Sequence, residues 1–514
     1  MTVFATILVM LAAAVVLLAV ARSLRLPYPA LLALAGAVVA VAPVDVGLRM
    51  DPELALALFI APVLLDAAYD TSLRDLKRHW APVASLALIA VGLTTVAVAL
   101  VVHSLVPAIP WAAAIAIGAI VAPPDAVAAT TVLRDLKLPR RVSVILEGEA
   151  LLNDASALLI YRLAVTAVLA GGNIGADAIA PTFLLSLFGS VIAGLGLAWV
   201  SGRLTRRIED VPSSIIIQFV STYGVWVLAE RAGLSPILTM VSYAMALARS
   251  TPAYLPARLR IPSYAVWETA VLVLNVLAFL IIGLELGPII AAARPGELGR
   301  WTFIGAAVLG TVIGVRLLWT FAGVLWAQWR LSGGAAAPGD GPIPSWRTGL
   351  VIGWAGTRGL ITIATALALP QSFPERGMLL FAAFTVTLGT LLIQGLTLRP
   401  LVLALQMPED NTVERELQDA RLAIAQAALA ALGEDAGEEA DILRQRLRAE
   451  SKTAAAAQET LDRSNTPSTA LRAKILAVRR ECLLALRSDG VIGDDAFHRL
   501  EEELDFADLA LARN

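Results

Sequence analysis

The stretch EGEALLNDASALLIYRLAVTAVL, residues 147–169, combines an apolar membrane-spanning pattern with ionisable and amide side chains. Apolar residues fill its second half, and its first half holds four polar groups: Glu147, Glu149, Asn153 and Asp154. A charged group at the depth of the hydrocarbon costs about 2.5–3.5 kcal/mol on insertion scales, so such groups are rare unless they are functional or paired. This stretch therefore indicates a membrane protein that acts through polar groups inside the bilayer.

The composition of the whole chain supports the same class. The protein has 514 residues, of which 58% are hydrophobic and only 16% are charged, whereas about a quarter of a soluble protein is charged. Its apolar runs are roughly 20 residues long, which is the length that crosses a hydrocarbon core of ~30 Å. The first run, 4–20, has no basic residue before it, so we expect a retained helix and not a cleaved signal peptide. The only cysteine, Cys482, excludes an intrachain disulfide.

The apolar runs predict an all-α polytopic protein with thirteen spans, of which the second and ninth are short enough to be tilted or broken. The predicted spans are 4–20, 30–43, 53–69, 81–105, 111–133, 142–170, 180–201, 213–230, 235–249, 264–290, 301–328, 346–369 and 377–404.

The distribution of basic residues predicts the orientation of these spans. The odd-numbered connections between spans, which are the first set, hold 17 Lys and Arg residues in total. The even-numbered connections hold five. Because cytoplasmic loops are enriched in Lys and Arg, the first set is expected to be cytoplasmic. The N-terminus is then outside and the C-terminus inside.

The last part of the chain differs in composition, so we predict a transmembrane domain over 1–407 and a helical cytoplasmic tail over 408–514. From Glu409 to the end the chain holds 22 acidic and 14 basic residues, and it is rich in Ala. Charged runs of this kind are usually solvated faces, so a solvated helical appendage is the first interpretation. A regulatory or dimer-contacting domain is the alternative.

Several ionisable residues fall inside the predicted spans, and their depth separates them into two groups. Asp125 and Asp154 are the fifteenth and thirteenth residues of their spans and lie near mid-membrane, where a merely structural role is hardest to sustain. Residues near span ends can reach the interface. The full set is Asp66, Asp125, Glu149, Asp154, Arg162, Glu230, Glu268, Glu285, Arg316 and Arg358.

Two of the predicted spans contain helix-breaking residues at membrane depth. Pro123 and Pro124 remove two backbone donors beside Asp125, and three glycines of the span 346–369 surround Arg358. These are the fifth and the twelfth predicted spans. Because their positions in the order of spans differ by an odd number, seven, they run in opposite directions through the membrane. Interrupted helices in two inverted halves are typical of the binding site of a secondary transporter. We therefore expect an inverted repeat whose two interrupted helices cross at mid-membrane.

The residue types at this depth favour cation and proton chemistry. The carboxylate of Asp154 offers hard oxygen ligands, and burial penalises its charged form, so it can take a proton or a cation but hardly both. That competition is the basis of exchange. Arg358 cannot lose its proton and is better suited to neutralise a carboxylate, with Glu149 as the expected partner.

At these residues the sequence resembles the cation/proton antiporter-1 family, the NhaP-like bacterial Na⁺/H⁺ antiporters that are related to the animal sodium/proton exchangers. EGEALLND is similar to the family signature EGESLLND, and APPDAVAAT is similar to its (T/P)DPVAV segment. LFIAPVLLDAAYDTSLRDL, FLIIGLEL and WAGTRGLITIATALALP resemble three further family segments. Five motifs in the same order over nearly all of 1–405 make this resemblance specific.

The resemblance implies a homodimer with a core region and a dimerisation region in the bacterial inner membrane, and it implies roles for individual residues. Asp154 would carry the cation and the proton with Asn153 beside it. Asp125 and the backbone carbonyl of Pro124 would be further ligands. Glu149 and Arg358 would form a structural ion pair, which matches the pairing expected from their charges.

The sequence differs from the family pattern at Ala150, Pro124 and Asp66; Pro124 keeps the backbone carbonyl that can bind the ion, whereas Ala150 and Asp66 leave the choice among Na⁺, K⁺ and Li⁺ open. Ala150 stands where the family has a serine that can bind the ion, and Pro124 stands where it has a threonine. Asp66, a further candidate ligand, occupies a position that is usually Glu.

The expected function is exchange of a monovalent cation, Na⁺ before Li⁺ or K⁺, for H⁺, serving pH and sodium homeostasis. Exchange is expected to be electroneutral, because Asn153 is an amide where electrogenic relatives carry a second aspartate. No cofactor and no nucleic-acid partner are expected; the partners are monovalent cations, protons, the bilayer and a second copy of the chain. A K⁺/H⁺ antiporter and a proton-uncoupled cation channel are the alternatives.

An enzyme is a further alternative to these transport functions. Intramembrane aspartyl, rhomboid-type and zinc proteases need a Gly-x-Gly-Asp segment, a membrane histidine and a His-Glu-x-x-His motif, respectively. The predicted spans lack the first and the last of these, and His103 lies near a span end. A non-enzymatic protein is therefore expected.

Overall fold

The computed structural model describes residues 2–41, 52–125, 129, 131, 133, 136, 138–171, 176–251, 255–332 and 345–407, together with scattered residues between 420 and 449. The chain divides into two compact units, Met1–Glu409 and Asp410–Asn514. All elements below belong to the first unit. The predicted cytoplasmic tail, 408–514, lies almost entirely outside the described residues and stays a prediction.

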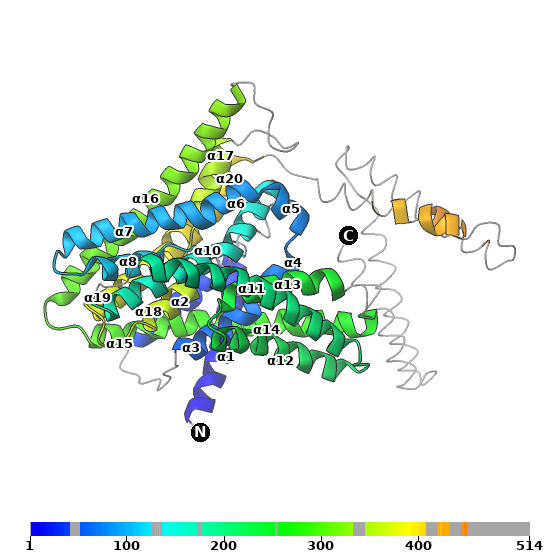
Figure 1. Ribbon diagram of the computed structural model, residues 1–514, viewed down its shortest axis with the longest axis horizontal. Coiled ribbons are helices and arrows are strands. Elements are labelled where there is room, and N and C mark those ends of the chain that lie inside the picture. The colour runs from blue at the N-terminus through cyan, green and yellow to red at the C-terminus, as the bar shows by residue number, and fades with distance from the viewer. Residues whose placement is uncertain are drawn as a thin grey trace. The chain divides into compact units, whose positions relative to one another are not determined.

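Every regular element described in the first unit is a helix (Figure 1). Among the described residues, eight helical segments are long and apolar enough to cross a membrane, and shorter apolar helices cover Tyr28–Val41, Leu56–Tyr69 and Trp111–Val121. The prediction of an all-α polytopic membrane protein is thus confirmed. The count of thirteen spans and the inverted repeat stay predictions. The eight segments are Ala5–Leu24, Trp80–Leu105, Arg140–Leu169, Ser186–Thr205, Val211–Arg231, Arg258–Ala291, Glu297–Trp329 and Arg376–Leu405.

The helices pack as two groups, and the first, here called the site bundle, contains both interrupted spans. Its closest pairs are α7 with α8, α8 with α10, and α16 with α17 and α19. Its elements are α6 (Trp80–Ala84), η2 (Ser85–Ala90), α7 (Val91–Leu105), α8 (Trp111–Val121), α10 (Arg140–Leu169), α16 (Glu297–Ser332), α17 (Trp346–Trp354), α18 (Leu360–Leu367), α19 (Arg376–Thr390), η4 (Leu391–Gly395) and α20 (Leu396–Leu405).

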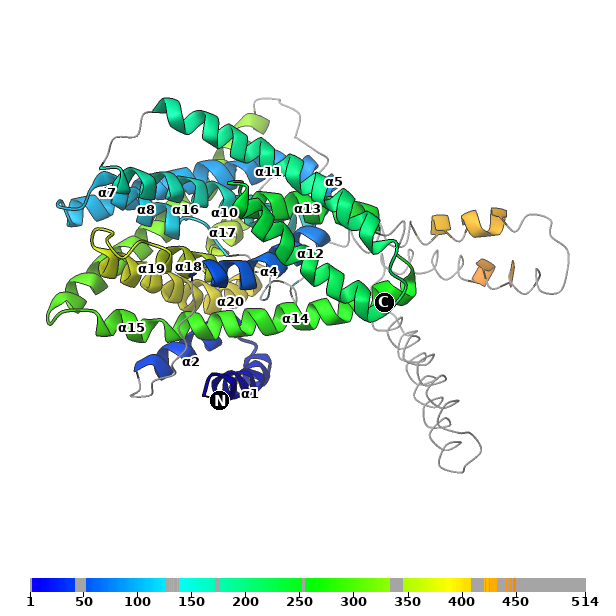
Figure 2. The ribbon, with the colours of Figure 1, turned by 60° about the horizontal axis from the view of Figure 1, so that its bottom comes forward.

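The second group, here called the companion bundle, packs most closely through α11 with α13 and α2 with α14. Figure 2 shows α14 running along one side of the molecule with α2 next to it. The elements are α1 (Thr2–Leu24), α2 (Tyr28–Val41), α3 (Pro52–Ala55), η1 (Leu56–Ile60), α4 (Ala61–Asp70), α11 (Ala176–Thr205), α12 (Val211–Arg231), α13 (Pro236–Ser250) and α14 (Ala257–Leu284). The short helices α5 (Leu73–Arg78) and α15 (Leu286–Ala291) are the remaining helices described in this unit.

Small residues allow α2 and α14 to approach closely. A Cβ atom added at Gly283 would lie 2.2 Å from the Ala33 carbonyl oxygen, and one added at Gly36 would lie 2.3 Å from the Leu280 carbonyl oxygen. Backbones that touch in this way are typical of membrane helices, whose association depends on close van der Waals packing.

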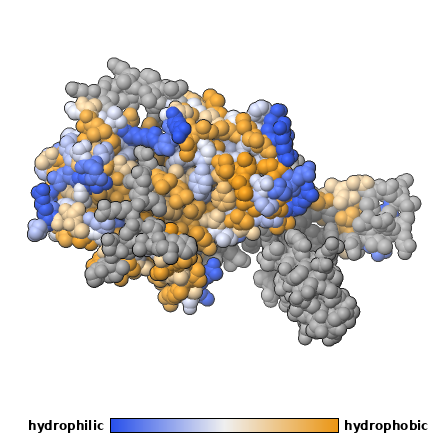
Figure 3. Space-filling model, turned by 90° about the horizontal axis from the view of Figure 1, so that it is seen from below, coloured by the Kyte–Doolittle hydropathy of each residue, from blue (hydrophilic) through white to orange (hydrophobic). Residues whose placement is uncertain are grey.

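On the face that Figure 3 shows, apolar side chains cover much of the surface, and hydrophilic residues gather in a few patches between them. On α11, Phe188, Ile192 and Trp199 recur at helical spacing and are 62%, 70% and 62% exposed. Exposed apolar stripes of this size would be unfavourable in water and are expected where lipid surrounds the protein.

Both predicted interruptions are confirmed. Helix α8 ends at Val121, directly before Ala122, Pro123 and Pro124. The other span divides into α17 and α18, and residues 355–359 between them have no regular structure. Irregular backbone at this depth is tolerated only where it is buried in protein or lines a watery cavity.

Candidate functional site

The two interrupted segments meet through their backbones. The amide N–H of Asp125 donates to the carbonyl oxygen of Thr357 at 2.6 Å, and the Thr357 hydroxyl donates to the carbonyl oxygen of Asp125 at 3.2 Å. These bonds satisfy groups that the broken helices leave without partners. The residues expected to cross are therefore in direct contact.

Helix α10 brings the opening stretch of the sequence to this crossing. Glu149, Asn153 and Asp154 are buried, with exposed fractions of 1%, 0% and 5%. The Asn153 amide donates through Nδ2 to the carbonyl oxygen of Pro124 at 2.9 Å. Asn153 thus ties α10 to the break after α8. The Pro124 carbonyl, which was expected to bind the cation, accepts a hydrogen bond here, and its role as a ligand stays a prediction.

The carboxylate of Asp154 differs from the other buried charges around it. Within the described part of the chain, no side chain or backbone N–H donates a hydrogen bond to it. The Oδ1 atom of Asn153, the preceding residue, is likewise buried without a partner among the described residues. A buried carboxylate without donors is strongly driven to take up a proton or a cation.

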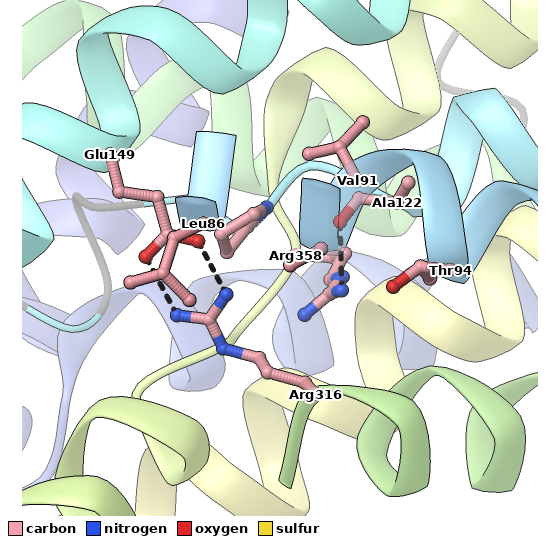
Figure 4. Close-up of a pocket in the computed structure, with 9 residues that line it drawn as sticks. Leu86, Val91, Thr94, Ala122, Glu149, Arg316 and Arg358 are labelled. Atoms are coloured by element: carbon pink, nitrogen blue, oxygen red, sulfur yellow. Dashed lines mark hydrogen bonds and ion pairs between the residues drawn. The ribbon is translucent and has the colours of Figure 1, made fainter. Parts of the chain in front are cut away.

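The partner of Glu149 is Arg316, and the predicted pair of Glu149 with Arg358 is wrong. The guanidinium of Arg316 holds both carboxylate oxygens of Glu149 at 2.5 and 2.9 Å (Figure 4). Both side chains are almost fully buried. A planar guanidinium that meets a carboxylate through two parallel bonds is the strongest common geometry for such a pair. Arg316 also donates to the carbonyl oxygen of Ile352 on α17 at 3.1 Å.

Arg358 caps a broken helix instead. Its Nε and Nη2 atoms donate to the carbonyl oxygens of Val121 and Ala122, both at 2.9 Å, and Nη1 donates to the Gly356 carbonyl. Its own backbone N–H donates to the Thr390 hydroxyl at 2.9 Å. The carbonyls at the end of a helix carry partial negative charge. Because these carbonyls already accept from Arg358, its guanidinium needs no carboxylate.

Asp125 has the complementary place at the other broken helix. A Cβ atom added at Gly359 would lie only 1.4 Å from Asp125 Oδ2, so the carboxylate rests directly against the glycine backbone. Gly359 precedes the first residue of α18, and a helix N-terminus favours negative charge. Each interrupted segment thus supplies the charge that compensates the helix end of the other.

A small cavity of about 10 Å³ lies beside the crossing, which is close to the space that one water molecule needs. The Glu149–Arg316 pair and Arg358 line it together with Thr94 of α7 (Figure 4). The remaining lining residues are Leu86, Ala90, Val91, Ala122 and Pro124.

Asp66 lies on α4 of the companion bundle and is half-buried. Its neighbours Leu64 and Leu65 belong to the apolar cluster that also contains Leu151 of α10. Asp66 is therefore on a helix that packs against α10, and its role as a cation ligand stays a prediction.

The ion pair of Asp75 with Arg140 was not anticipated. Asp75 Oδ2 accepts from Arg140 at 2.6 Å (Nη2) and 3.0 Å (Nε), which ties α5 to the first residue of α10. Burial alone would raise the pKa of Asp75, but the hydrogen bond and charge of Arg140 outweigh it and lower that pKa. Asp75 and Arg140 lie in two different connections between predicted spans, and sequence patterns do not indicate which residues of separate connections pair.

No group of three or more His, Cys, Asp or Glu residues that could hold a resident metal occurs in the part of the chain that the structure describes. A transported cation is a substrate and needs to bind only transiently. The oxygen atoms of Asp154, Asp125 and Asn153 are of the kind that alkali cations prefer.

Comparison with known proteins identifies the family. A family-wide profile described as "Sodium/hydrogen exchanger, transmembrane" matches residues 9–404. The chain belongs to this family. An uncharacterized Na⁺/H⁺ exchanger of Mycobacterium tuberculosis is 28% identical to this exchanger over 98% of the chain and 95% of its own length. The sodium, potassium, lithium and rubidium/H⁺ antiporter of Bacillus pumilus is 29% identical over 80% of the chain and 63% of its own length.

A solved structure supports the same fold. The sodium proton antiporter MjNhaP1 of Methanocaldococcus jannaschii superposes with a TM-score of 0.60 at 17% identity, covering 79% of this exchanger and 99% of MjNhaP1. The resemblance to NhaP-like antiporters is thus confirmed. The exchanger is a multi-pass membrane protein of a family of transporters, not of enzymes, and that family moves cations in exchange for protons.

Gly359→Ala should reduce exchange by roughly 100-fold, the scale of a 1 Å misplacement at a reacting centre. The new methyl group would overlap Asp125 Oδ2, so the carboxylate must move. The measurement is the initial rate of cation-driven proton flux in proteoliposomes. Gly310→Ala on α16 is the matched control, because a Cβ atom there meets nothing within 4 Å. An undiminished rate in Gly359→Ala would show that the position of Asp125 does not matter.

Proposed function

We propose that the exchanger carries one Na⁺ against one H⁺ across the membrane, with Asp154 as the group that binds either ion. The observation that carries this proposal is the buried Asp154 carboxylate, which lacks donors among the described residues while the helix ends around it are compensated by other charges. Asp125, the Pro124 carbonyl and Asn153 are the further groups proposed at the cation site, and Asp66 is proposed as an additional ligand.

The charges at the crossing support electroneutral exchange. Asp125, Glu149 and Asp154 are three acidic groups, and Arg316 and Arg358 are two basic ones. The set carries a net charge of −1 when Asp154 is empty and of zero when it holds a proton or Na⁺. Movement of the site across the membrane costs little when Asp154 holds a proton or Na⁺, because the site is then neutral. The same movement with Asp154 empty and charged is unfavourable in a medium of low dielectric. That difference couples the two fluxes.

The two bundles support a transport cycle in which the site bundle moves against the companion bundle. The bundles touch through α10 with α4 and α13, through α18 with α3, η1 and α14, and through α2 with α19 and η4. We further propose thirteen spans with an inverted repeat, an outside N-terminus, a cytoplasmic C-terminus and a homodimer. The physiological role proposed is pH and sodium homeostasis.

The testing experiment is an ion screen in proteoliposomes that contain a trapped pH dye. Addition of Na⁺, Li⁺ or K⁺ to one side should move protons to that side, with Na⁺ effective at the lowest concentration. Cation flux without opposite proton flux would instead identify a channel.

K⁺/H⁺ exchange is the second candidate function. The name of the Bacillus pumilus relative includes potassium and rubidium. Ala150 here supplies no hydroxyl oxygen beside Glu149, and a site with fewer fixed ligands discriminates less by size. A lower half-saturating concentration for K⁺ than for Na⁺ in the same screen would favour this candidate.

The exchange rate should not depend on membrane potential. The measurement is Na⁺/H⁺ exchange in proteoliposomes whose potential is clamped with K⁺ and valinomycin, after K⁺ has been excluded as a substrate. A rate or end-point that shifts systematically with the clamped potential would mean that net charge moves, and that Asp125 or another group carries a second proton.

A further inference from the structure

We propose that Gln394 is a positioning residue of the transport cycle. Its carboxamide binds the backbone of residues 355–359, here called the break segment, in the state in which the site opens to the opposite face of the membrane. This role rests on the proposed function, because it needs an exchanger that alternates between two states. Gln394 belongs to none of the five sequence motifs and does not line the cavity beside the crossing.

The side chain of Gln394 is buried without a partner. The residue is 0% exposed, and neither Oε1 nor Nε2 has a hydrogen-bond partner among the described residues. A buried carboxamide has lost its hydrogen bonds to water, so nearly all such groups are bonded within the protein. Leucine or methionine at this position would avoid the cost. We therefore infer that the carboxamide finds its partners in the other state of the cycle.

The helix face that carries Gln394 meets the break segment. Thr390 precedes Gln394 by four residues, and its hydroxyl accepts from the backbone N–H of Arg358 at 2.9 Å. Leu398 follows Gln394 by four residues and belongs to the same apolar cluster as Ala355. Residues four apart share a helix face. Gln394 therefore lies between one residue that bonds the end of the break segment and one that packs near its start.

The residue after Gln394 lies between the break segment and the companion bundle. A Cβ atom added at Gly395 would lie 3.9 Å from Cγ2 of Thr357 and 3.7 Å from Cγ of Pro27, which directly precedes α2. Helix α2 also contacts η4, the element that holds Gln394. Movement of the companion bundle against the site bundle thus acts directly on η4, which can pass it to the break segment.

The break segment offers both kinds of group that a carboxamide needs. Within the part of the chain that the structure describes, the N–H of Thr357 donates no backbone hydrogen bond and the carbonyl oxygen of Ala355 accepts none. A carboxamide donates through its nitrogen and accepts through its oxygen. A small movement of Gln394 toward this backbone would therefore satisfy both partners.

The geometry of η4 (Leu391–Gly395) provides such a movement. This element is a π-helical turn within the single span Arg376–Leu405, between α19 and α20. A π turn holds one residue more than an α turn needs, and such turns occur often at functional sites. Conversion of a π turn to an α turn rotates the adjoining helix by about 100°, the angle of one residue. The side chain of Gln394 changes direction with it.

Gln394→Met should slow exchange without destabilising the protein. Methionine is similar in shape, so it removes the unpaired amide from the state seen in the structure and the hydrogen bonds from the other state. Net hydrogen bonds of this kind change an equilibrium roughly twofold to tenfold each. The maximal exchange rate should therefore fall about tenfold. The shorter carboxamide of Gln394→Asn should recover part of the rate.

Three measurements test the proposal. The first is the initial rate of Na⁺/H⁺ exchange in proteoliposomes at saturating Na⁺, which should fall as stated. The second is the thermal unfolding midpoint in detergent, which should equal or exceed the wild-type value for Gln394→Met. The third is hydrogen–deuterium exchange of the break-segment amides, which should become faster because the state that protects them is less populated.

Gln218 on α12 is the matched control, because its carboxamide is bonded in the structure. Its Oε1 accepts from Trp267 at 2.8 Å, and its Nε2 donates to Ser263 at 3.2 Å and to Ser214 at 3.3 Å. Gln218→Met should therefore lower the unfolding midpoint. It should leave hydrogen–deuterium exchange of the break segment unchanged.

Each contrary result has a distinct meaning. A lower unfolding midpoint in Gln394→Met would show that the carboxamide is bonded in the state seen in the structure, and would overturn its role. An undiminished exchange rate, which a resident water at the amide would allow, or unchanged protection of the break segment would overturn it too. A wild-type protein without exchange would overturn the proposed function, and the deuterium measurement would then decide whether Gln394 binds the break segment.

Discussion

Asp154→Asn should reduce cation/proton exchange to the background of empty liposomes. The substitution keeps the shape of the side chain but removes both its charge and its ability to take up a proton. Because the wild-type carboxylate has no donor among the described residues, the neutral amide breaks no hydrogen bond found in that part of the chain. The protein should therefore fold normally and lose only its function.

The measurement combines proton flux in proteoliposomes with thermal unfolding in detergent. Glu268→Gln is a suitable control, since it also neutralises a carboxylate but at an exposed position of α14. Near-normal transport by Asp154→Asn would exclude Asp154 as the carrier and would direct attention to Asp125. Loss of folding would instead give this residue a structural role.

Substitution of either Glu149 or Arg316 should cause the second-largest effect, a loss of about 3–5 kcal/mol of folding free energy. Glu149→Gln leaves the guanidinium buried without its counter-charge, and Arg316→Met does the same to the carboxylate. The pair is almost fully buried, with 4% and 2% of the side chains exposed. Desolvation of the remaining charge is therefore not relieved by water.

The double variant distinguishes a true pair from two independent charges. Glu149→Gln with Arg316→Met should lose much less stability than the sum of the single losses, because no unpaired charge remains. Arg300 and Glu375 provide the matched surface pair at 3.3 Å, with 54% and 42% of their side chains exposed. Their removal should cost less than about 1 kcal/mol. Additive losses at Glu149 and Arg316 would contradict the pairing.

Local sequence patterns carried much of the information about the fold. Apolar runs of membrane-spanning length fix an all-α membrane architecture, because the bilayer leaves helices and closed barrels as the only spanning structures. Pro123 and Pro124 determine where α8 must end, since they remove backbone donors wherever the chain folds. The proposed carrier, Asp154, could also be predicted from the sequence, because its depth in the membrane follows from its position within an apolar span.

The tertiary structure alone decided which charges meet. Glu149 and Arg316 are 167 residues apart in sequence, and both Arg316 and Arg358 were candidates by depth and charge. The pairing predicted from sequence was wrong because it matched opposite charges and did not count the backbone carbonyls that a broken helix leaves unsatisfied. Arg358 satisfies those of α8, so Glu149 is left to Arg316. Periodicity and helix-breaking residues are local properties, whereas the partner of a buried charge depends on the relative positions of helices far apart in the chain.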